Sequence, residues 1–218
     1  MGDTQPSAGQ RRWHLAGVSA RGLSHIKAGM PCQDSHVCRE LAGGAVVIAV
    51  ADGAGSAALS QLGSARAALA AVEWVEELLQ GGCPAEEAEW RALLTATLET
   101  AHESVLNAAR KRNVTPRELA TTLIVLIATP TCAAAVQVGD GAAVVATADN
   151  RLVALTVPQR GEFVNETRFF TAPEYLESAH YGFFRGPVTG LGALSDGLQL
   201  LALKMPEATP HPAFFLPL

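Results

Sequence analysis

Apolar residues recur along the chain with two different spacings, and each spacing predicts one type of element. Residues 46–51 are aliphatic and mostly β-branched, which is typical of a buried strand. Residues 60–80 and 84–111 instead carry apolar side chains at steps of three and four residues, which predicts two amphipathic helices. Because such helices bury one face, we expect the pair to cover a β-sheet.

From residue 120 onward the pattern indicates a series of short strands. Turn residues separate stretches of β-branched and aliphatic residues, and these stretches are 121–128, 131–138, 142–147 and 151–156. We expect an antiparallel meander here. Residues 37–41 and 45–51 predict an earlier hairpin, and residues 12–19 predict a first strand. A strand pair, two helices and then several strands is the order of an α+β fold.

The rest of the chain is less regular. Residues 1–12, rich in Gly, Ser, Gln and Pro, are predicted to be a disordered tail, and residues 13–218 a single domain. Residues 158–187 are polar and irregular, so they predict either a flap beside a site or a long connection.

Aspartates stand where several apolar stretches end. Asp52 follows the strand 46–51, and the predicted hairpin would bring Asp34 to the same end. Asp140 and Asp196 each follow an apolar stretch and precede a glycine. Carboxylates are the oxygen ligands that Mg²⁺ and Mn²⁺ prefer, and several converging on one point would repel each other without a cation. The sequence therefore predicts a metal site.

Other interpretations compete at single motifs. Asp140 and its glycine lie between alternating segments, where Asp-Gly is also a strong hairpin signal, and alone this motif favours a simple turn. The glycine loop after Asp52 lacks the residues that complete a nucleotide-binding motif. Cys32 lies beside Asp34 and His36, but the irregularly spaced cysteines are more typical of small apolar filling residues. His102 lies on a helix face where packing is the commoner role.

Composition excludes some classes of partner. The chain has 218 residues, 49% apolar and 17% charged, enough for one full core. Its formal charge of −5 argues against a general nucleic-acid surface. We see no stretch of apolar residues long enough to span a membrane and no secretory leader, so we expect no membrane association and a cytoplasmic protein. In the loop 21–31, Arg21, His25 and Lys27 could bind an anion, although a solvated loop explains them equally well.

Five short motifs occur in an order that resembles the metal-dependent serine/threonine protein phosphatases of the type 2C class, in their bacterial form. The motifs are Gln33-Asp34, Asp52-Gly53, Thr121-Thr122-Leu123, Gly139-Asp140-Gly141 and Ser195-Asp196-Gly197. The resemblance spans about residues 13–200. It implies a four-layer α-β-β-α sandwich, in which two antiparallel sheets are flanked by helix pairs.

The resemblance also implies a function and a ligand set. Two Mg²⁺ or Mn²⁺ ions, with a third at a weaker position, would support hydrolysis of phosphoserine and phosphothreonine in proteins by metal-activated water. Asp52 would bridge both metals and the Gly53 carbonyl would bind one. Asp34 would act mainly through coordinated water, Asp196 would bind the other side, and Asp140 would fit the third position. The implied partners are a phosphorylated protein and a serine/threonine kinase.

Several positions depart from the family pattern. Gln33 stands where an acidic residue is common, and Ala54 stands where many members carry a histidine. The usual phosphate-binding arginine is missing, so Lys27, His25 or Arg21 would have to replace it, and His25 and Lys27 are the expected substrate-binding residues. The chain stops at Leu218 without the family's last metal-binding aspartate, which predicts a C-terminal truncation or an under-coordinated metal. The alternative function is therefore a weakly active relative that binds phosphoproteins or regulates a kinase.

Overall fold

The computed structural model describes residues 13–158 and 169–217, so the predicted tail 1–12 lies outside the described residues. The α-helices are α1 Leu23–Lys27, α2 Ser60–Leu78, α3 Glu87–Arg112, α4 Gln199–Ala202 and α5 Pro212–Phe215. The strands are β1 Ser35–Glu40, β2 Val46–Ala51, β3 Leu123–Thr129, β4 Cys132–Val138, β5 Ala142–Thr147, β6 Leu152–Thr156, β7 His180–Arg185, β8 Val188–Leu194, β9 Leu203–Lys204 and β10 Thr209–Pro210. Short 3₁₀ helices are η1 Ala42–Gly44, η2 Leu79–Gly81, η3 Pro116–Leu119, η4 Tyr175–Ser178 and η5 Asp196–Leu198.

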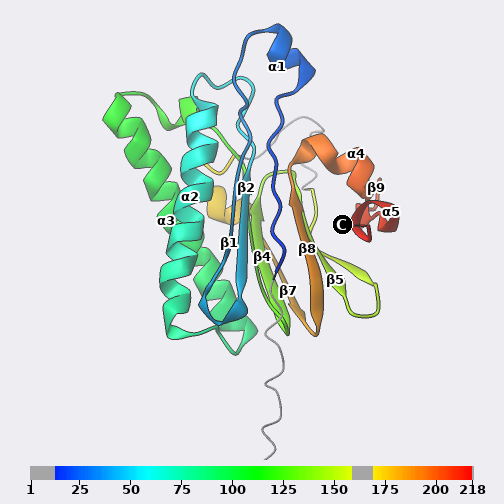
Figure 1. The fold of residues 1–218 in the computed structure, drawn as a ribbon. Coiled ribbons are helices and arrows are strands. Elements are labelled where there is room, and N and C mark those ends of the chain that lie inside the picture. Colours follow the sequence, from blue (N-terminus) through cyan, green and yellow to red (C-terminus); the bar gives the residue numbers. More distant parts are fainter. Residues whose placement is uncertain (1–12, 159–168, 218) are drawn as a thin grey trace, which may run out of the picture.

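Two antiparallel sheets form the centre of the molecule. The first has the strand order β1-β2-β3-β4-β7 and the second has the order β6-β5-β8 (Figure 1). Every strand pairing in both sheets is antiparallel. The α+β class with two antiparallel sheets, predicted from the order of elements and from the family resemblance, is therefore confirmed.

Strand β3 shows why the sheets are buried on both sides. Its side chains alternate, so that Leu123 and Val125 pack into the core under α2 and α3. Ile124 and Leu126 point the other way and pack between the two sheets with residues such as Val145. A strand covered on both faces must be apolar throughout, which explains the unbroken aliphatic run in this part of the sequence.

The long helices cover only the outer face of the first sheet. As predicted, α2 and α3 lie side by side there (Figure 1). The resemblance also implied a helix pair outside the second sheet, and the described residues do not form one. The short elements α4, β9, β10 and α5 lie beside that sheet instead. Pro206, Pro210 and Pro212 interrupt this stretch, so a long helix cannot form in it.

The N-terminal segment differs from the predicted strand. Residues 13–20 form no ladder with a sheet. Trp13 instead donates its indole N–H to the Gly44 carbonyl at 3.0 Å, and Ser19 hydrogen-bonds with His36 at 2.9 Å. The segment is therefore held by side-chain hydrogen bonds rather than by backbone pairing with a strand. The alternation of apolar residues in the sequence does not distinguish these two arrangements.

The predicted meander is wrong at Asp140. Strand β4 pairs with β3 and β7, whereas β5 pairs with β6 and β8, so Gly139–Gly141 connects the two sheets. The interpretation of Asp140-Gly141 as a hairpin turn is therefore wrong. Gly139 has a φ of 119°, and a Cβ there would lie 2.5 Å from Thr122. The crossing needs glycine for its backbone conformation and for its close approach to β3.

The segment 158–187 contains more regular structure than expected. Residues 180–185 form β7, which pairs with β4 and completes the first sheet. Residues 159–168, where the predicted flap would be centred, lie outside the described residues. Within the described ranges, no helix has the length and apolar character needed to cross a membrane.

Candidate metal centre

The β1–β2 hairpin brings two of the predicted site aspartates to one end of the first sheet. Ser35 pairs with Ala51 in its register, so Asp34 and Asp52 occupy the adjoining positions beyond the ladder. Short strands of matched length fix this geometry, because a slip of one residue would turn every side chain to the other face. The predicted proximity of these two residues is what the structure has.

Two threonines just before β3 fix the backbone of Asp52. The Asp52 N–H donates to the Thr122 hydroxyl at 2.9 Å, and the Thr121 hydroxyl donates to the Asp52 carbonyl at 2.9 Å. The same carbonyl accepts the Thr122 N–H at 2.8 Å. Both threonines are buried, so water does not compete for these bonds. The Thr-Thr motif therefore positions the central carboxylate rather than contacting a ligand itself.

The loop after Asp52 turns within very little space. The Gly53 N–H donates to the Gln33 carbonyl at 3.2 Å, and that carbonyl also accepts the Ser64 hydroxyl at 2.6 Å. A Cβ on Gly53 would lie 2.7 Å from the Gln33 carbonyl oxygen and 2.8 Å from the Ser60 Cβ. Glycine at this position therefore lets the segment before β1, the loop and the first turn of α2 pack against one another.

The second sheet delivers the third aspartate. Asp196 begins η5 just after β8, whose last residue Leu194 pairs with Ala142 at the start of β5. The Gln199 side chain donates a hydrogen bond to the backbone carbonyl of Asp140. This bond ties the turn that carries Asp196 to the crossing between the sheets.

The three aspartates converge, and their pKa values reflect it. Burial, together with the nearby charges of Asp34 and Asp196, raises the pKa of Asp52 to about 9. Burial also raises the pKa of Asp34, although a hydrogen bond with Asp52 and the charge of His25 oppose the shift. Like charges and partial burial each disfavour ionisation, so this cluster favours either a shared proton or a bound cation.

The three carboxylates are the type of ligand that a hard divalent cation prefers. Interactions with both Asp34 and Asp196 raise the pKa of Asp52 beyond the effect of burial. Within the described ranges, no three His, Cys, Asp or Glu side chains already surround a point with metal-ligand spacing. The three carboxylates are thus near enough to influence one another's pKa, but they do not surround a common centre. Gln33, the residue before Asp34, has a side chain that is 4% exposed, and its Oε1 has no hydrogen-bond partner among the described groups.

The remaining predicted residues are distributed around this cluster. His25, on α1, lies close enough to Asp34 to lower its pKa. Lys27 is exposed at the end of α1, and its side chain makes no hydrogen bond or ion pair with the described residues. Asp140 is half-buried, and its charge is not among those that shift the pKa of Asp34 or Asp52. The structure thus brings four of the predicted residues together, with Gly53 beside Asp52.

Sequence reasoning missed a buried glutamine that supports the site. Gln137 lies in β4 with no exposed surface, and its amide donates to the carbonyls of Gly139, Gly141 and Val157 at 2.9–3.1 Å. Its Oε1 accepts the Thr156 hydroxyl at 2.6 Å. A single amide therefore satisfies the backbone where the chain crosses between sheets. A glutamine inside a run of small apolar residues was the available signal.

Comparison with known proteins identifies relatives of this arrangement. A family model described as protein phosphatase 2C matches residues 21–218. Serine/threonine-protein phosphatase 3 of Escherichia coli is 31% identical over 211 residues, covering 94% of this chain and 81% of the relative.

Solved structures agree on the fold. The serine/threonine phosphatase of S. agalactiae has a TM-score of 0.59 at 16% identity, covering 85% of this chain and 79% of that one. The catalytic domain of the serine/threonine protein phosphatase PstP, solved in complex with two manganese ions, has a TM-score of 0.52 at 19% identity, covering 81% and 79%. The family model matches residues 21–218, and the relative in Escherichia coli is matched over most of its length. This chain therefore belongs to the protein phosphatase 2C family and is a protein phosphatase.

Proposed function

We propose that this chain hydrolyses phosphoserine and phosphothreonine in proteins, with Mg²⁺ or Mn²⁺ held at the end of the β-sandwich. The observation that carries the proposal is the convergence of Asp34, Asp52 and Asp196 from two different sheets. Their proximity and partial burial raise the pKa of Asp52 to about 9, which is the electrostatic signature of a site that lacks positive charge.

Each carboxylate has a separate part in this proposal. Asp52 interacts electrostatically with both other aspartates, so its carboxylate would bridge two ions, and the adjacent Gly53 carbonyl would bind one of them. Asp34 would hold coordinated water, Asp196 would close the side formed by the second sheet, and Asp140 would serve a third, weaker position. Two bound divalent ions supply a nucleophilic water near neutral pH and neutralise charge on the phosphoryl oxygens.

The substrate phosphate would enter beside α1. His25 lies near Asp34, and Lys27 is two residues further along the same short helix. We propose that these two side chains orient the phosphate oxygens, a role in which positive charge and hydrogen-bond donation matter more than proton transfer. The substrates would be phosphorylated proteins, so the enzyme would reverse the reaction of a serine/threonine kinase.

The proposal is tested by hydrolysis of p-nitrophenyl phosphate and of a phosphoserine peptide with manganese present. We expect a chelator to abolish turnover and Asp52→Asn to lower it at least about a hundredfold, since ligand loss exceeds the usual effect of a supporting residue. Asp149→Asn is the matched control, because Asp149 is an exposed carboxylate paired with Arg151 in a surface turn. Equal loss in both variants, or turnover that survives the chelator, would refute the metal site.

The binding-module alternative is less well supported, because the relatives that match this chain carry phosphatase names. The same experiment separates the two functions. A chain that binds the phosphopeptide but releases no phosphate at any manganese concentration would act as a module rather than as an enzyme.

A further inference from the structure

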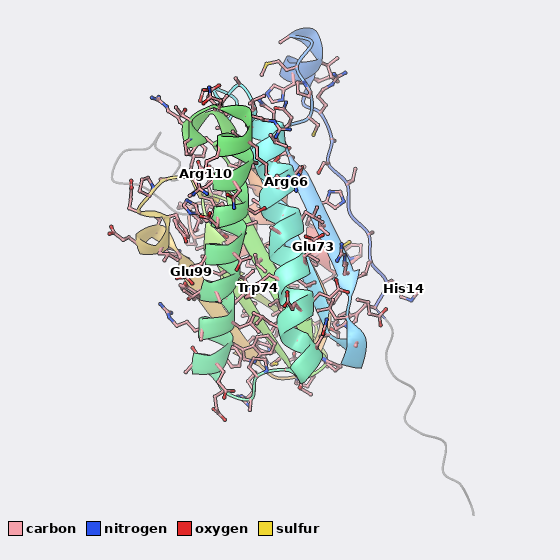
Figure 2. All side chains as sticks on the ribbon, turned by 90° about the vertical axis from the view of Figure 1, so that its left-hand side faces the viewer. His14, Arg66, Glu73, Trp74, Glu99 and Arg110 are labelled. Atoms are coloured by element: carbon pink, nitrogen blue, oxygen red, sulfur yellow. The ribbon has the colours of Figure 1, made fainter. Side chains whose placement is uncertain are left out.

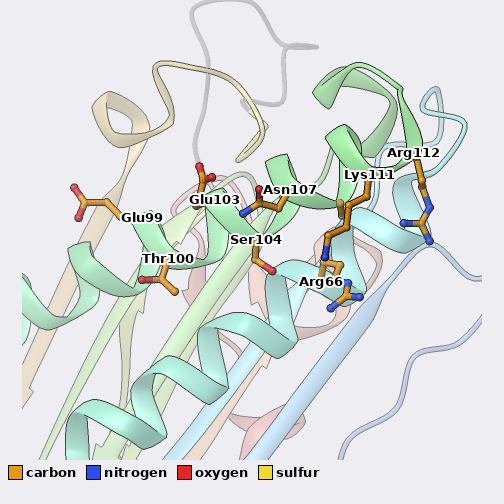
Figure 3. Close-up of a pocket in the computed structure, with 9 residues that line it drawn as sticks. Arg66, Glu99, Thr100, Glu103, Ser104, Asn107, Lys111 and Arg112 are labelled. Carbon is orange, nitrogen blue, oxygen red and sulfur yellow. The ribbon is translucent and has the colours of Figure 1, made fainter.

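A groove runs along the outer surface between α2 and α3, on the face of the helix pair turned away from the sheet. Figure 2 shows the two helices face-on, and Figure 3 shows the groove from closer range. Its volume is about 820 Å³. Arg66 contributes to it from α2, and α3 contributes the other lining residues, including Ser104 and Asn107.

Positive charge gathers at one end of this groove. Arg66, Lys111 and Arg112 lie close together there (Figure 3). In the described part of the chain, none of these three side chains forms an ion pair or a hydrogen bond. Toward the other end, Glu103 is already paired with Arg110 at 2.9 Å. The chain carries a net charge of −5, so an uncompensated basic cluster is a local exception.

Helix electrostatics explains only part of the cluster. Lys111 and Arg112 lie in the last turn of α3, where the negative end of the helix dipole favours cations. Arg66 lies in the second turn of α2, near the positive end of that helix, so it gains nothing from the dipole. Bringing a third cation to the other two costs free energy unless an anion binds them.

The basic end lies at the same end of the molecule as the aspartates. Helix α2 starts just after the Gly53 loop, and Gly53 packs directly against Ser60. A rise of about 1.5 Å per residue places the backbone of Arg66 about 9 Å along the axis from Ser60. An extended peptide advances about 3.3 Å per residue, so a substrate residue three to six positions from the phosphorylated one would lie roughly 10–20 Å from the aspartates.

We propose that Arg66, Lys111 and Arg112 bind acidic side chains of the protein substrate, about three to six residues from its phosphorylated residue. The inference rests on the proposed function, because it names the substrate class of the same site. A short acidic segment fits better than a nucleic acid, since the exposed Glu99 along the rest of the groove would repel a continuous polyanion.

The test compares three phosphoserine peptides of equal length. One carries glutamates three to six residues before the phosphoserine, one carries them after it, and one has glutamines throughout. For one of the acidic peptides we expect kcat/KM about three- to tenfold above that of the neutral peptide, the size expected of two or three exposed charge pairs. The preference should shrink as salt is raised.

Charge reversal separates recognition from catalysis. Arg66→Glu and Lys111→Glu should each remove or invert the preference, while hydrolysis of p-nitrophenyl phosphate stays at the wild-type rate. Lys204→Glu is the matched control, because Lys204 is exposed beside the second sheet and should leave the preference intact. Equal kcat/KM for all three peptides, or a preference that survives both reversals, would overturn the proposal.

Lack of phosphatase activity can be distinguished from lack of acidic-segment binding in the groove. If the wild-type chain does not hydrolyse p-nitrophenyl phosphate, the proposed function has failed, and binding of the fluorescently labelled acidic peptide is then measured by anisotropy. Binding that Arg66→Glu weakens at least about threefold supports the acidic-segment site. Absence of binding, or equal binding of the acidic and neutral peptides, contradicts it.

Discussion

Gln33 is the residue that most distinguishes this site. Its side chain is 4% exposed, its Oε1 has no partner among the described groups, and it immediately precedes Asp34 in the chain. An amide contributes an oxygen without a charge, so the attraction for a cation falls on the three aspartates alone. A buried carbonyl oxygen left without a hydrogen bond is costly, which favours a role for it when the site is filled.

Gln33→Glu should therefore strengthen metal binding. We expect Mn²⁺ affinity, measured by titration calorimetry, to rise about tenfold, because a fourth negative charge would act at short range in a half-buried site. In chelator the same variant should melt at a lower temperature than the wild type, since the added charge is buried without compensation. Gln33→Met is the control of similar size. An equal gain in affinity for the methionine variant would show that charge is not the cause.

His102 has the structural role that its position on a helix face predicted. Its ring stacks on Tyr175 with centroids 4.1 Å apart and meets Phe170 edge-on at 5.5 Å. Burial lowers the pKa of His102, although a hydrogen bond with the Thr171 backbone opposes the shift. The histidine therefore packs as a mostly neutral ring that fastens the segment after residue 169 to α3.

At the scale of elements, the site depends on how one loop joins β2 to α2. The loop has no room for a side chain at Gly53, whereas at Gly55 a Cβ would meet only the Gln33 Oε1, at 3.9 Å. The two glycines are two residues apart in the same loop, Gly53 buried and Gly55 exposed, so they form a natural pair for comparison.

Gly53→Ala should separate the loop from its neighbours. We expect the free energy of unfolding to fall by about 1–3 kcal/mol, as for other overpacked sites, and metal-dependent turnover to fall with it. Gly55→Ala should change both by little, since 3.9 Å is ordinary van der Waals contact. Denaturant unfolding and a manganese-dependent assay on the two variants check this. Indistinguishable variants would show that the loop relaxes easily.

At the scale of the whole molecule, the site exists only because two sheets meet. Asp34 and Asp52 come from the first sheet and Asp196 follows a strand of the second. The apolar layer between the sheets, including Ile124, Leu126 and Val145, sets the distance between these groups. Packing of the whole core thus holds three like charges close together, at a cost in stability that a cation would offset.

This cost predicts a pH dependence of stability in chelator. Burial and the neighbouring aspartates raise the pKa of Asp52 from 3.8 to about 9, so the folded state holds a proton that the unfolded state has lost. The free energy of unfolding should therefore decrease as pH rises through this window, from full stabilisation below 3.8 to its loss above about 9. Asp52→Asn, which cannot titrate, should flatten the profile.

The effect is measured by denaturant unfolding of the wild type and Asp52→Asn in chelator at pH values from about 5 to 9. This is roughly the pH range in which domains are usually most stable. The difference between the two profiles isolates Asp52 from opposing groups such as His102, whose lowered pKa makes stability rise with pH. Saturating Mn²⁺ should reduce the slope of the wild type, because the cation replaces the proton. Parallel profiles for the two proteins in chelator would contradict the coupling.

The sequence by itself determined the element types and the identity of the central aspartates. Periodicity located α2, α3 and most of the strands, because a helix or strand that buries one face must repeat its apolar residues at a fixed interval. The hairpin placed Asp34 beside Asp52 by register alone. These are local properties, or pairings between neighbours in the chain, and a sequence contains them directly.

Only the tertiary structure decided which strands share a sheet. Asp140 lies where the chain crosses between the sheets rather than in a hairpin, because β4 pairs with β3 and β7 whereas β5 pairs with β6 and β8. The bonds that Thr121, Thr122 and Gln137 make also join segments far apart or pass through the crossing. The basic end of the α2–α3 groove likewise combines residues more than forty positions apart. Such juxtapositions follow from the packing of the whole core, which no local pattern specifies.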